Sequence, residues 1–268
     1  MLDQYTVVLV EPQNPINLGT VIRAMKNMGM RHLALVNPAD MDWEKTQISA
    51  HKTSEYIETM KTYSSLDEAL YGCRESYGFS ARRRTQTWAS IPVVQAVSRS
   101  LDIAKDHGNI AFVFGREQTG LTNAELERCT FQVHIPTSDY TSMNLAQAVL
   151  LAMYEVNRQL SEGQVATASL DRTAVIDNYA PGSSPTTLDQ QRRLLKKFGD
   201  TLVDIGYFKS EAPNTAIHRV QNILTRAQLH DDEVNLLMGM CAEVANYANL
   251  LKRGIEPKRI RPQDSLLD

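Results

Sequence analysis

The chain of 268 residues has few of the side chains that build metal sites. Its three cysteines lie far apart and form no CxxC pair, and its six histidines show no metal-ligand spacing. The sequence therefore predicts no metal site, and such sparse cysteines are typical of a protein of the reducing cytoplasm.

Long hydrophobic runs are also missing. No stretch approaches the roughly 20 apolar residues of a membrane-spanning helix. The N-terminal segment MLDQYTVVLVEP lacks the basic start and the long apolar region of a signal peptide. We therefore expect a soluble, cytoplasmic protein that does not bind membranes.

Neither sign of charge dominates, because the net charge is −3 and the pI is about 6.1. Such a chain has no overall positive field, so any contact with nucleic acid must come from local patches. The residue types and spacings of Ser-His-Asp, Cys-His and paired-carboxylate catalysis are missing as well. An enzyme with this sequence would work by positioning two reactants.

Short apolar runs alternate with helical patterns through about residue 160. Strands are predicted at residues 5–10, 33–36, 77–79, 109–115 and 131–135. Helices are predicted at residues 20–28, 65–72, 93–105, 122–128 and 144–159, and residues 43–57 look helical without clean periodicity. This alternation predicts an α/β domain with a parallel sheet at residues 1–160.

The composition changes after residue 160. Residues 161–187 are rich in Ser, Thr, Ala, Gly and Pro, which predicts a flexible linker. Residues 188–268 carry helical periodicity and no strand-like alternation, so we expect a small all-α C-terminal domain. A core of that size is marginal alone, and docking or dimerisation would support it.

The first of three candidate functional loops contains Asn17, Gly19 and Arg23. Gly19 permits close approach of the backbone, and the start of the following helix offers free N–H groups to an anion. Arg23 is expected about one turn into that helix. The alternative is a capped helix that carries a surface arginine.

The second loop, FGREQTGL at residues 114–121, follows a strongly apolar strand. Two glycines flank Arg116 and Glu117 and suit a ligand held by main-chain atoms, although the pattern is neither GxGxxG nor a Walker A motif. The alternative is a loop in which Arg116 and Glu117 pair with each other.

The third loop lies within IPTSDYTSMNLAQAV, residues 135–149. Ser142 and Asn144 supply polar groups beside a helix start, while Ile135 and Met143 supply apolar walls that can surround a flat heterocycle. From the residues alone, Met143 fits a core position as well as it fits a ligand contact.

A cationic segment, SARRR at residues 80–84, precedes Trp88. Three consecutive arginines suit phosphate contacts, and the alternative is a solvated charged loop. Basic side chains also gather in the C-terminal part, where acidic residues nearly balance them.

Taken in order, the three loops resemble the three motifs of the SPOUT class of RNA 2′-O-ribose methyltransferases. The matching pieces are NxGxxxR at residues 17–23, FGREQTGLTNAEL at residues 114–126 and IPTSDYTSMNLAQAV at residues 135–149. The segment SARRRTQTW, the linker and the helical C-terminal part are similar to a bacterial branch of this class. That branch methylates tRNA at position 32, the first nucleotide of the anticodon loop.

The resemblance implies a parallel-sheet SPOUT fold with a deep C-terminal trefoil knot, which no periodicity could show. It also implies a homodimer that acts on tRNA, with S-adenosylmethionine as methyl donor and S-adenosylhomocysteine as product. The cofactor-binding positions would be Phe79, Ser80, Ala81, Gly115, Ile135, Ser142, Met143 and Asn144. The RNA-binding positions would be Asn17, Arg23, Arg82, Arg84 and Arg116.

Arg23 matches the arginine assigned to catalysis in that class. Because arginine is a poor base, we favour an electrostatic and positioning role for it. The sequence departs from the class at Phe79, where relatives usually have a small hydroxyl residue, so a backbone contact is expected there. Residues 49–57 also lack the small Gly-Ala segment of relatives.

Two other functions remain open from the sequence. The same chemistry could act on ribosomal RNA, or the chain could be a non-catalytic RNA-binding protein on the same scaffold.

Overall fold

The computed structural model describes residues 1–51, 53–81, 90–161, 183–208 and 213–255. The chain divides into two compact units, Met1–Asp177 with Thr187–Asp189 and Asn178–Thr186 with Gln190–Asp268. Most of the predicted linker at residues 161–187 lies outside the described residues, so the predicted domain boundaries stay predictions.

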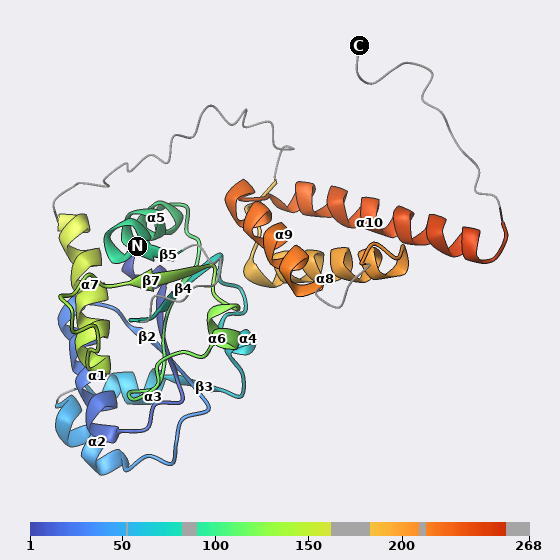
Figure 1. Ribbon diagram of the computed structural model, residues 1–268. Coiled ribbons are helices and arrows are strands. Elements are labelled where there is room, and N and C mark those ends of the chain that lie inside the picture. The colour runs from blue at the N-terminus through green and yellow to red at the C-terminus, as the bar shows by residue number, and fades with distance from the viewer. Residues whose placement is uncertain (52, 82–89, 162–182, 209–212, 256–268) are drawn as a thin grey trace. The chain divides into compact units, whose positions relative to one another are not determined.

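The first unit is built on a seven-stranded sheet in the order β3-β2-β1-β6-β4-β7-β5 (Figure 1). All six neighbouring pairs are parallel. The strands are β1 (Tyr5–Val10), β2 (His32–Val36), β3 (Lys61–Tyr63), β4 (Glu75–Phe79), β5 (Ser90–Pro92), β6 (Ile110–Phe114) and β7 (Phe131–His134). The predicted parallel α/β architecture is confirmed.

Helices cover both faces of this sheet, which explains why its central strand β6, IAFVF, is apolar without interruption. After a short 3-10 turn at Leu2–Gln4, the helices are α1 (Pro15–Met28), α2 (Trp43–Ala50), α3 (Ser54–Thr59), α4 (Leu66–Ala69), α5 (Val93–Lys105), α6 (Asn123–Leu126) and α7 (Leu145–Ser161).

Successive side chains of a strand point to opposite faces of the sheet, and this alternation creates two cores. Val7 and Leu9 of β1 join the core that contains α1, α5 and α7. Val8 and Val10 join the core that contains α4 and α6. Figure 1 shows these two groups of helices on opposite sides of the sheet.

Two edge strands were not predicted. β3 and β5 have three residues each and are partly exposed, so neither shows an apolar run that a sequence pattern could detect. The stretch at residues 43–57 also differs from the expectation, because it forms two helices, α2 and α3, rather than one.

Helix α1 begins at Pro15, earlier than the predicted start at residue 20. The Asn14 side chain accepts a hydrogen bond from the Ile16 N–H, and proline at the first helical position needs no N–H partner. Gly19 therefore lies inside the helix, and Arg23 lies about 12 Å along its axis from the start rather than one turn in.

Gly19 is needed for helix packing. A Cβ atom at Gly19 would lie 2.0 Å from the Ser49 Oγ and 2.5 Å from the Thr46 carbonyl oxygen, both in α2. The expectation that Gly19 opens the backbone to an anion is wrong, because the backbone of α2 occupies that space.

In the second unit, the described residues form the helices α8 (Leu188–Asp204), α9 (Pro213–Ala227) and α10 (Asp231–Lys252). An isolated antiparallel bridge joins Pro185 to His230. The three helices match the predicted periodicity, whereas an independent all-α domain stays a prediction. Across both units, no helix in the described part of the chain is long and apolar enough to cross a membrane.

Candidate active site

The carboxyl ends of β1, β6, β4 and β7 lie next to one another, because these four strands are adjacent and parallel. Loops at the carboxyl ends of such strands are where open α/β sheets bind ligands. The three candidate loops follow β1, β6 and β7, and Ser80 follows β4. The fold thus brings segments separated by more than 100 positions to one edge.

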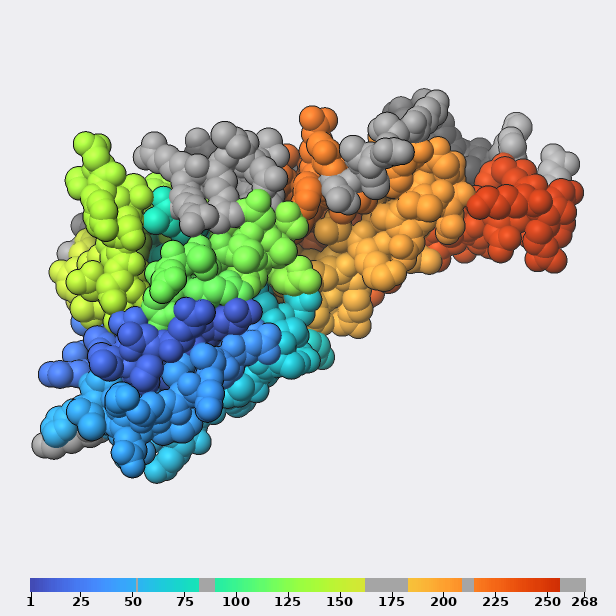
Figure 2. Space-filling view, turned by 60° about the horizontal axis from the view of Figure 1, so that its bottom comes forward, coloured from blue at the N-terminus to red at the C-terminus, as the bar shows by residue number. Residues whose placement is uncertain are grey.

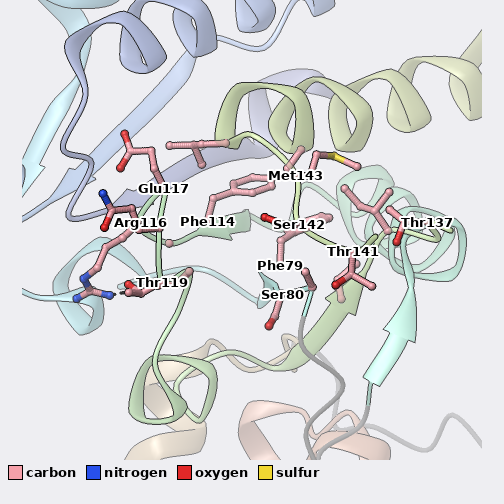
Figure 3. Close-up of a pocket in the computed structure, with 18 residues that line it drawn as sticks. Phe79, Ser80, Phe114, Arg116, Glu117, Thr119, Thr137, Thr141, Ser142 and Met143 are labelled. Atoms are coloured by element: carbon pink, nitrogen blue, oxygen red, sulfur yellow. Dashed lines mark hydrogen bonds between the residues drawn. The ribbon is translucent and has the colours of Figure 1, made fainter. Parts of the chain in front are cut away.

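A cavity of about 300 Å³ lies at this edge (Figure 3). Its walls are the end of β4, the loop after β6, and the loop between β7 and α7. The volume is at the lower end of the range of small-molecule sites. The predicted cofactor positions that line it are Phe79, Ser80, Ala81, Gly115, Ile135, Ser142 and Met143.

Aromatic and aliphatic side chains form the apolar part of the cavity. The Phe79 ring stacks on Phe114, with ring centroids 4.4 Å apart and an interplanar angle of 14°. Phe79 is 7% exposed and belongs to the sheet core, so its side chain is structural and leaves mainly its backbone for a ligand. Met143 is half-buried at the cavity wall, which favours the ligand-contact interpretation over a core position.

The loop after β6 folds back on itself at two glycines. A Cβ atom at Gly115 would lie 2.1 Å from the Gly120 carbonyl carbon, and Gly120 itself has a φ of +67°. The Gly120 N–H closes the loop by donating to the Arg116 carbonyl oxygen at 2.9 Å. Main-chain atoms therefore form this wall of the cavity.

Asn17 joins the three loops. Its side-chain N–H donates to Glu117 Oε1 at 3.4 Å, and its side-chain oxygen accepts from the Asn144 Nδ2 at 3.1 Å. Figure 2 shows the blue surface of the N-terminal segment directly against the green surface of the middle of the chain. The three sequence motifs are thus hydrogen-bonded to one another through a single side chain.

Glu117 also accepts hydrogen bonds from backbone N–H groups that precede α1. The donors are the Asn14 N–H at 3.0 Å and the Gln13 N–H at 3.2 Å. The carboxylate thereby takes up donors next to the start of the helix, where negative charge is favourable. The sequence suggests only Arg116 as a partner for Glu117 and gives no signal for this linking role.

Asn144 caps α7, since its side-chain oxygen accepts from the Ala146 N–H at 2.9 Å. It is not among the described residues that line the cavity. A direct cofactor contact by Asn144 stays a prediction, and the observed role is to hold the start of α7 against Asn17.

Arg116 does not pair with its neighbour Glu117. Its guanidinium instead binds Glu11 at 2.8 Å and Glu125 at 2.9 Å, and the side chain is only 15% exposed. Hydrogen bonds to these two carboxylates raise the pKa of Arg116. Burial raises the pKa of Glu125, but the hydrogen bonds from Arg116 and the Thr122 backbone outweigh it and hold that pKa below its ordinary value. Figure 3 shows Arg116 pointing away from Phe79 and Ser142.

Of the remaining predicted RNA-binding residues, the structure describes Arg23 but not Arg82 or Arg84. Arg23 is exposed on α1 and is not among the described residues that line the cavity. Arg82 and Arg84 lie outside the described residues.

Thr137 and Thr141 also line the cavity, although they were not predicted from the sequence. The signal that could have identified them is their position in a polar loop before a helix. Among the described residues, no group of three or more His, Cys, Asp or Glu side chains could hold a metal ion.

Replacing Glu117 with alanine is expected to lower the free energy of unfolding by about 1–2 kcal/mol, because the N–H donors of Gln13, Asn14 and Asn17 lose a charged acceptor. Thermal unfolding of the full chain measures the change. The control is Gln118→Ala at the exposed neighbouring position. Equal unfolding temperatures for Glu117→Ala and the control would contradict the linking role.

Comparison with known proteins gives a family match for each of the two parts of the chain. Residues 4–154 match the model of the SpoU rRNA methylase family, and residues 189–254 match that of the tRNA methyltransferase TrmJ C-terminal domain. The tRNA (cytidine/uridine/adenosine-2′-O-)-methyltransferase TrmJ of Pseudomonas aeruginosa is 33% identical over 97% of this chain and 99% of its own length. The tRNA (cytidine/uridine-2′-O-)-methyltransferase TrmJ of Pectobacterium atrosepticum is 35% identical over 91% of this chain and 98% of its own.

Solved structures agree on the fold. The crystal structure of TrmJ from Z. mobilis superposes with a TM-score of 0.70 at 23% identity, covering 89% of this chain and 98% of that one. A probable methylase family protein from Haemophilus influenzae gives a TM-score of 0.57 at 28% identity, with 94% and 100% covered. The chain therefore belongs to the SpoU methylase family and, by its similarity over nearly the full length, to the TrmJ group within it.

Proposed function

We propose that this chain transfers a methyl group from S-adenosylmethionine to the 2′-oxygen of a cytidine or uridine ribose in tRNA, at nucleotide 32. The observation that carries the proposal is the cavity at the sheet edge, where the Asn17 side chain joins the loops by hydrogen bonds. The chain that contains this cavity is similar over nearly its full length to TrmJ enzymes. We also expect the activity to be cytoplasmic, because tRNA is its proposed substrate.

The cavity residues fit S-adenosylmethionine. Ile135 and Met143 offer apolar walls for a flat base, and the turn from Gly115 to Gly120 offers main-chain N–H and C=O groups. The hydroxyls of Thr141 and Ser142 supply further polar contacts. When bound, the cofactor supplies an electrophilic methyl group, and S-adenosylhomocysteine is the product after transfer.

Arg23 is the residue that we assign to catalysis. Its cationic side chain would hold the phosphate beside the target ribose and orient the 2′-hydroxyl toward the cavity. The positive charge would also stabilise the negative charge that develops on the 2′-oxygen as the hydroxyl loses its proton. Asn17, Arg82, Arg84 and Arg116 complete the proposed RNA contacts. Arg116 contributes least, because its bonds to Glu11 and Glu125 must break before it can bind a phosphate.

We expect a homodimer, and a trefoil knot in the C-terminal part of the α/β unit, as in the SPOUT class. Helices α1 and α7 pack together, and the Asn157 side chain of α7 donates to the Met28 carbonyl oxygen at 3.0 Å. These helices expose the apolar side chains of Ile16, Leu151 and Tyr154, which supports contact with a second copy. The match to the SpoU family over residues 4–154 supports the knot.

The test is methyl transfer from radiolabelled S-adenosylmethionine by the purified chain to tRNA and, separately, to ribosomal RNA. We expect label in tRNA alone and, by mass spectrometry, the loss of 2′-O-methylation at nucleotide 32 in cells that lack the protein. Label in ribosomal RNA alone would support the first alternative. Calorimetry that detects no cofactor binding would support the non-catalytic alternative.

A further inference from the structure

Helix α10 has two apolar faces. One face contributes Val234, Leu237 and Met238 to the core of the second unit. The other carries large side chains that are between 38% and 60% exposed. These residues, which we call the outer stripe, are Leu236, Met240, Val244, Tyr247 and Leu251.

The spacing of the outer stripe is that of a helix–helix seam. Successive members are three or four positions apart, which keeps them on one side of an α-helix. Helix α10 has 22 residues and is therefore about 33 Å long, so the stripe runs along most of its length. In Figure 1 the C-terminal part of α10 extends beyond α8 and α9.

The second unit has little core of its own among its described residues. The buried members of its apolar cluster are Leu194, Leu229 and Val234. A unit with so small a core is marginally stable, and a long exposed apolar row is a typical interaction surface. Covering the outer stripe would therefore add to the apolar surface that the unit buries.

Charges at the two ends of α10 favour one kind of partner for the outer stripe. The first turn carries Asp231, Asp232 and Glu233, whereas Lys252 and Arg253 lie at the other end. Two copies of α10 in antiparallel orientation bring each acidic end beside a basic end, and a parallel pair would bring like charges together. Within the helix, only Glu243 is charged between these ends.

We propose that the outer stripe is a contact between two copies of this chain, formed by antiparallel α10 helices around Val244. In this register Leu236 faces Leu251 of the second copy, and the two Val244 side chains lie beside the two-fold axis. The same surface serves both copies, as a two-fold interface requires. The contact is separate from the one expected at α1 and α7 and does not depend on the proposed activity.

Site-directed disulfide formation in the full chain tests the contact. The native cysteines Cys73, Cys129 and Cys241 are buried, so a disulfide between two copies is expected to form only through an introduced surface thiol. Under mild oxidation at low micromolar concentration, Val244→Cys should give a disulfide-linked dimer. Asn249→Cys is the matched control, because Asn249 is exposed on the side of α10 away from the stripe and should stay monomeric on a denaturing gel.

The register has a second test. Leu236→Cys alone and Leu251→Cys alone should not cross-link, because an antiparallel pair holds identical ends far apart, whereas a mixture of the two should yield the mixed dimer. Cross-linking of Leu236→Cys with itself would overturn the antiparallel arrangement. Equal cross-linking of Val244→Cys and Asn249→Cys would overturn the interface. A thiol at position 244 that resists alkylation without cross-linking would show that another surface covers the stripe, and would overturn the proposal as well.

Discussion

The Arg23→Ala variant is expected to methylate tRNA about 100- to 1,000-fold more slowly than the native chain, while S-adenosylmethionine binds as before. The two effects separate because Arg23 is exposed on α1 and is not among the described residues that line the cavity. Its loss would remove the charge that orients the target ribose and leave the cofactor walls intact. Single-turnover methyl transfer and calorimetric titration with S-adenosylmethionine measure the two quantities.

The matched control is Arg31→Ala, which removes an exposed arginine just beyond α1 and should leave the rate within about twofold, as expected of a surface charge outside the site. A lysine at position 23 should restore part of the rate, because it keeps the charge but not the planar, bidentate donor. Methyl transfer by Arg23→Ala at the native rate would refute the catalytic assignment. A loss of cofactor affinity equal to the loss of rate would show instead that Arg23 supports the cavity.

The second large effect is expected from Gly115→Ala. The added methyl group would meet the backbone of Gly120 at 2.1 Å and the Leu121 nitrogen at 2.3 Å, so the loop after β6 would have to move. Overpacking of this kind costs about 1–3 kcal/mol. If the loop relieves this strain in the free state but must take it up when the cofactor binds, binding weakens by roughly 5- to 150-fold. Calorimetry with S-adenosylmethionine measures the change.

Gly239→Ala is the control for Gly115→Ala. Gly239 lies inside α10, and apart from the helix's own backbone no described atom lies within 4 Å of the position of an added Cβ, so alanine should stabilise the helix by about 0.5–1 kcal/mol. Native cofactor affinity in Gly115→Ala would show that the loop tolerates the shift and that its main chain does not form the cofactor wall.

The two variants together test whether a site is shared between copies. If Arg23 of one copy acts on the cofactor held by the other, a mixed dimer of Arg23→Ala and Gly115→Ala contains one complete site. At a cofactor concentration too low to saturate Gly115→Ala, we then expect mixing the two impaired proteins to restore part of the methyl transfer. If each copy uses its own Arg23, the mixture should be no more active than its components.

Local patterns identified much of the fold because burial and capping are encoded by neighbouring residues. Helix α5 has the predicted bounds, and α6 begins with the predicted capping box of Thr122 and Glu125. The edge strands β3 and β5 were missed because a strand of three residues is fixed by its partner rather than by its own composition. The start of α1 was placed too late because Gly19 looked like a loop residue, whereas α2, distant in sequence, sets its role.

The loop at residues 135–149 and its two companions were identified from sequence as the candidate site, because polar residues after apolar strands mark the ligand edge of a parallel sheet. Hydrogen bonds among distant residues were not predictable, since their donors and acceptors become neighbours only when the sheet forms. Asn17, Glu117 and Asn144 meet for that reason, and Arg116 finds Glu11 and Glu125 rather than Glu117. The sequence by itself determined the parallel α/β architecture and the family, and only the tertiary structure decided which side chains line the cavity and which hold its loops together.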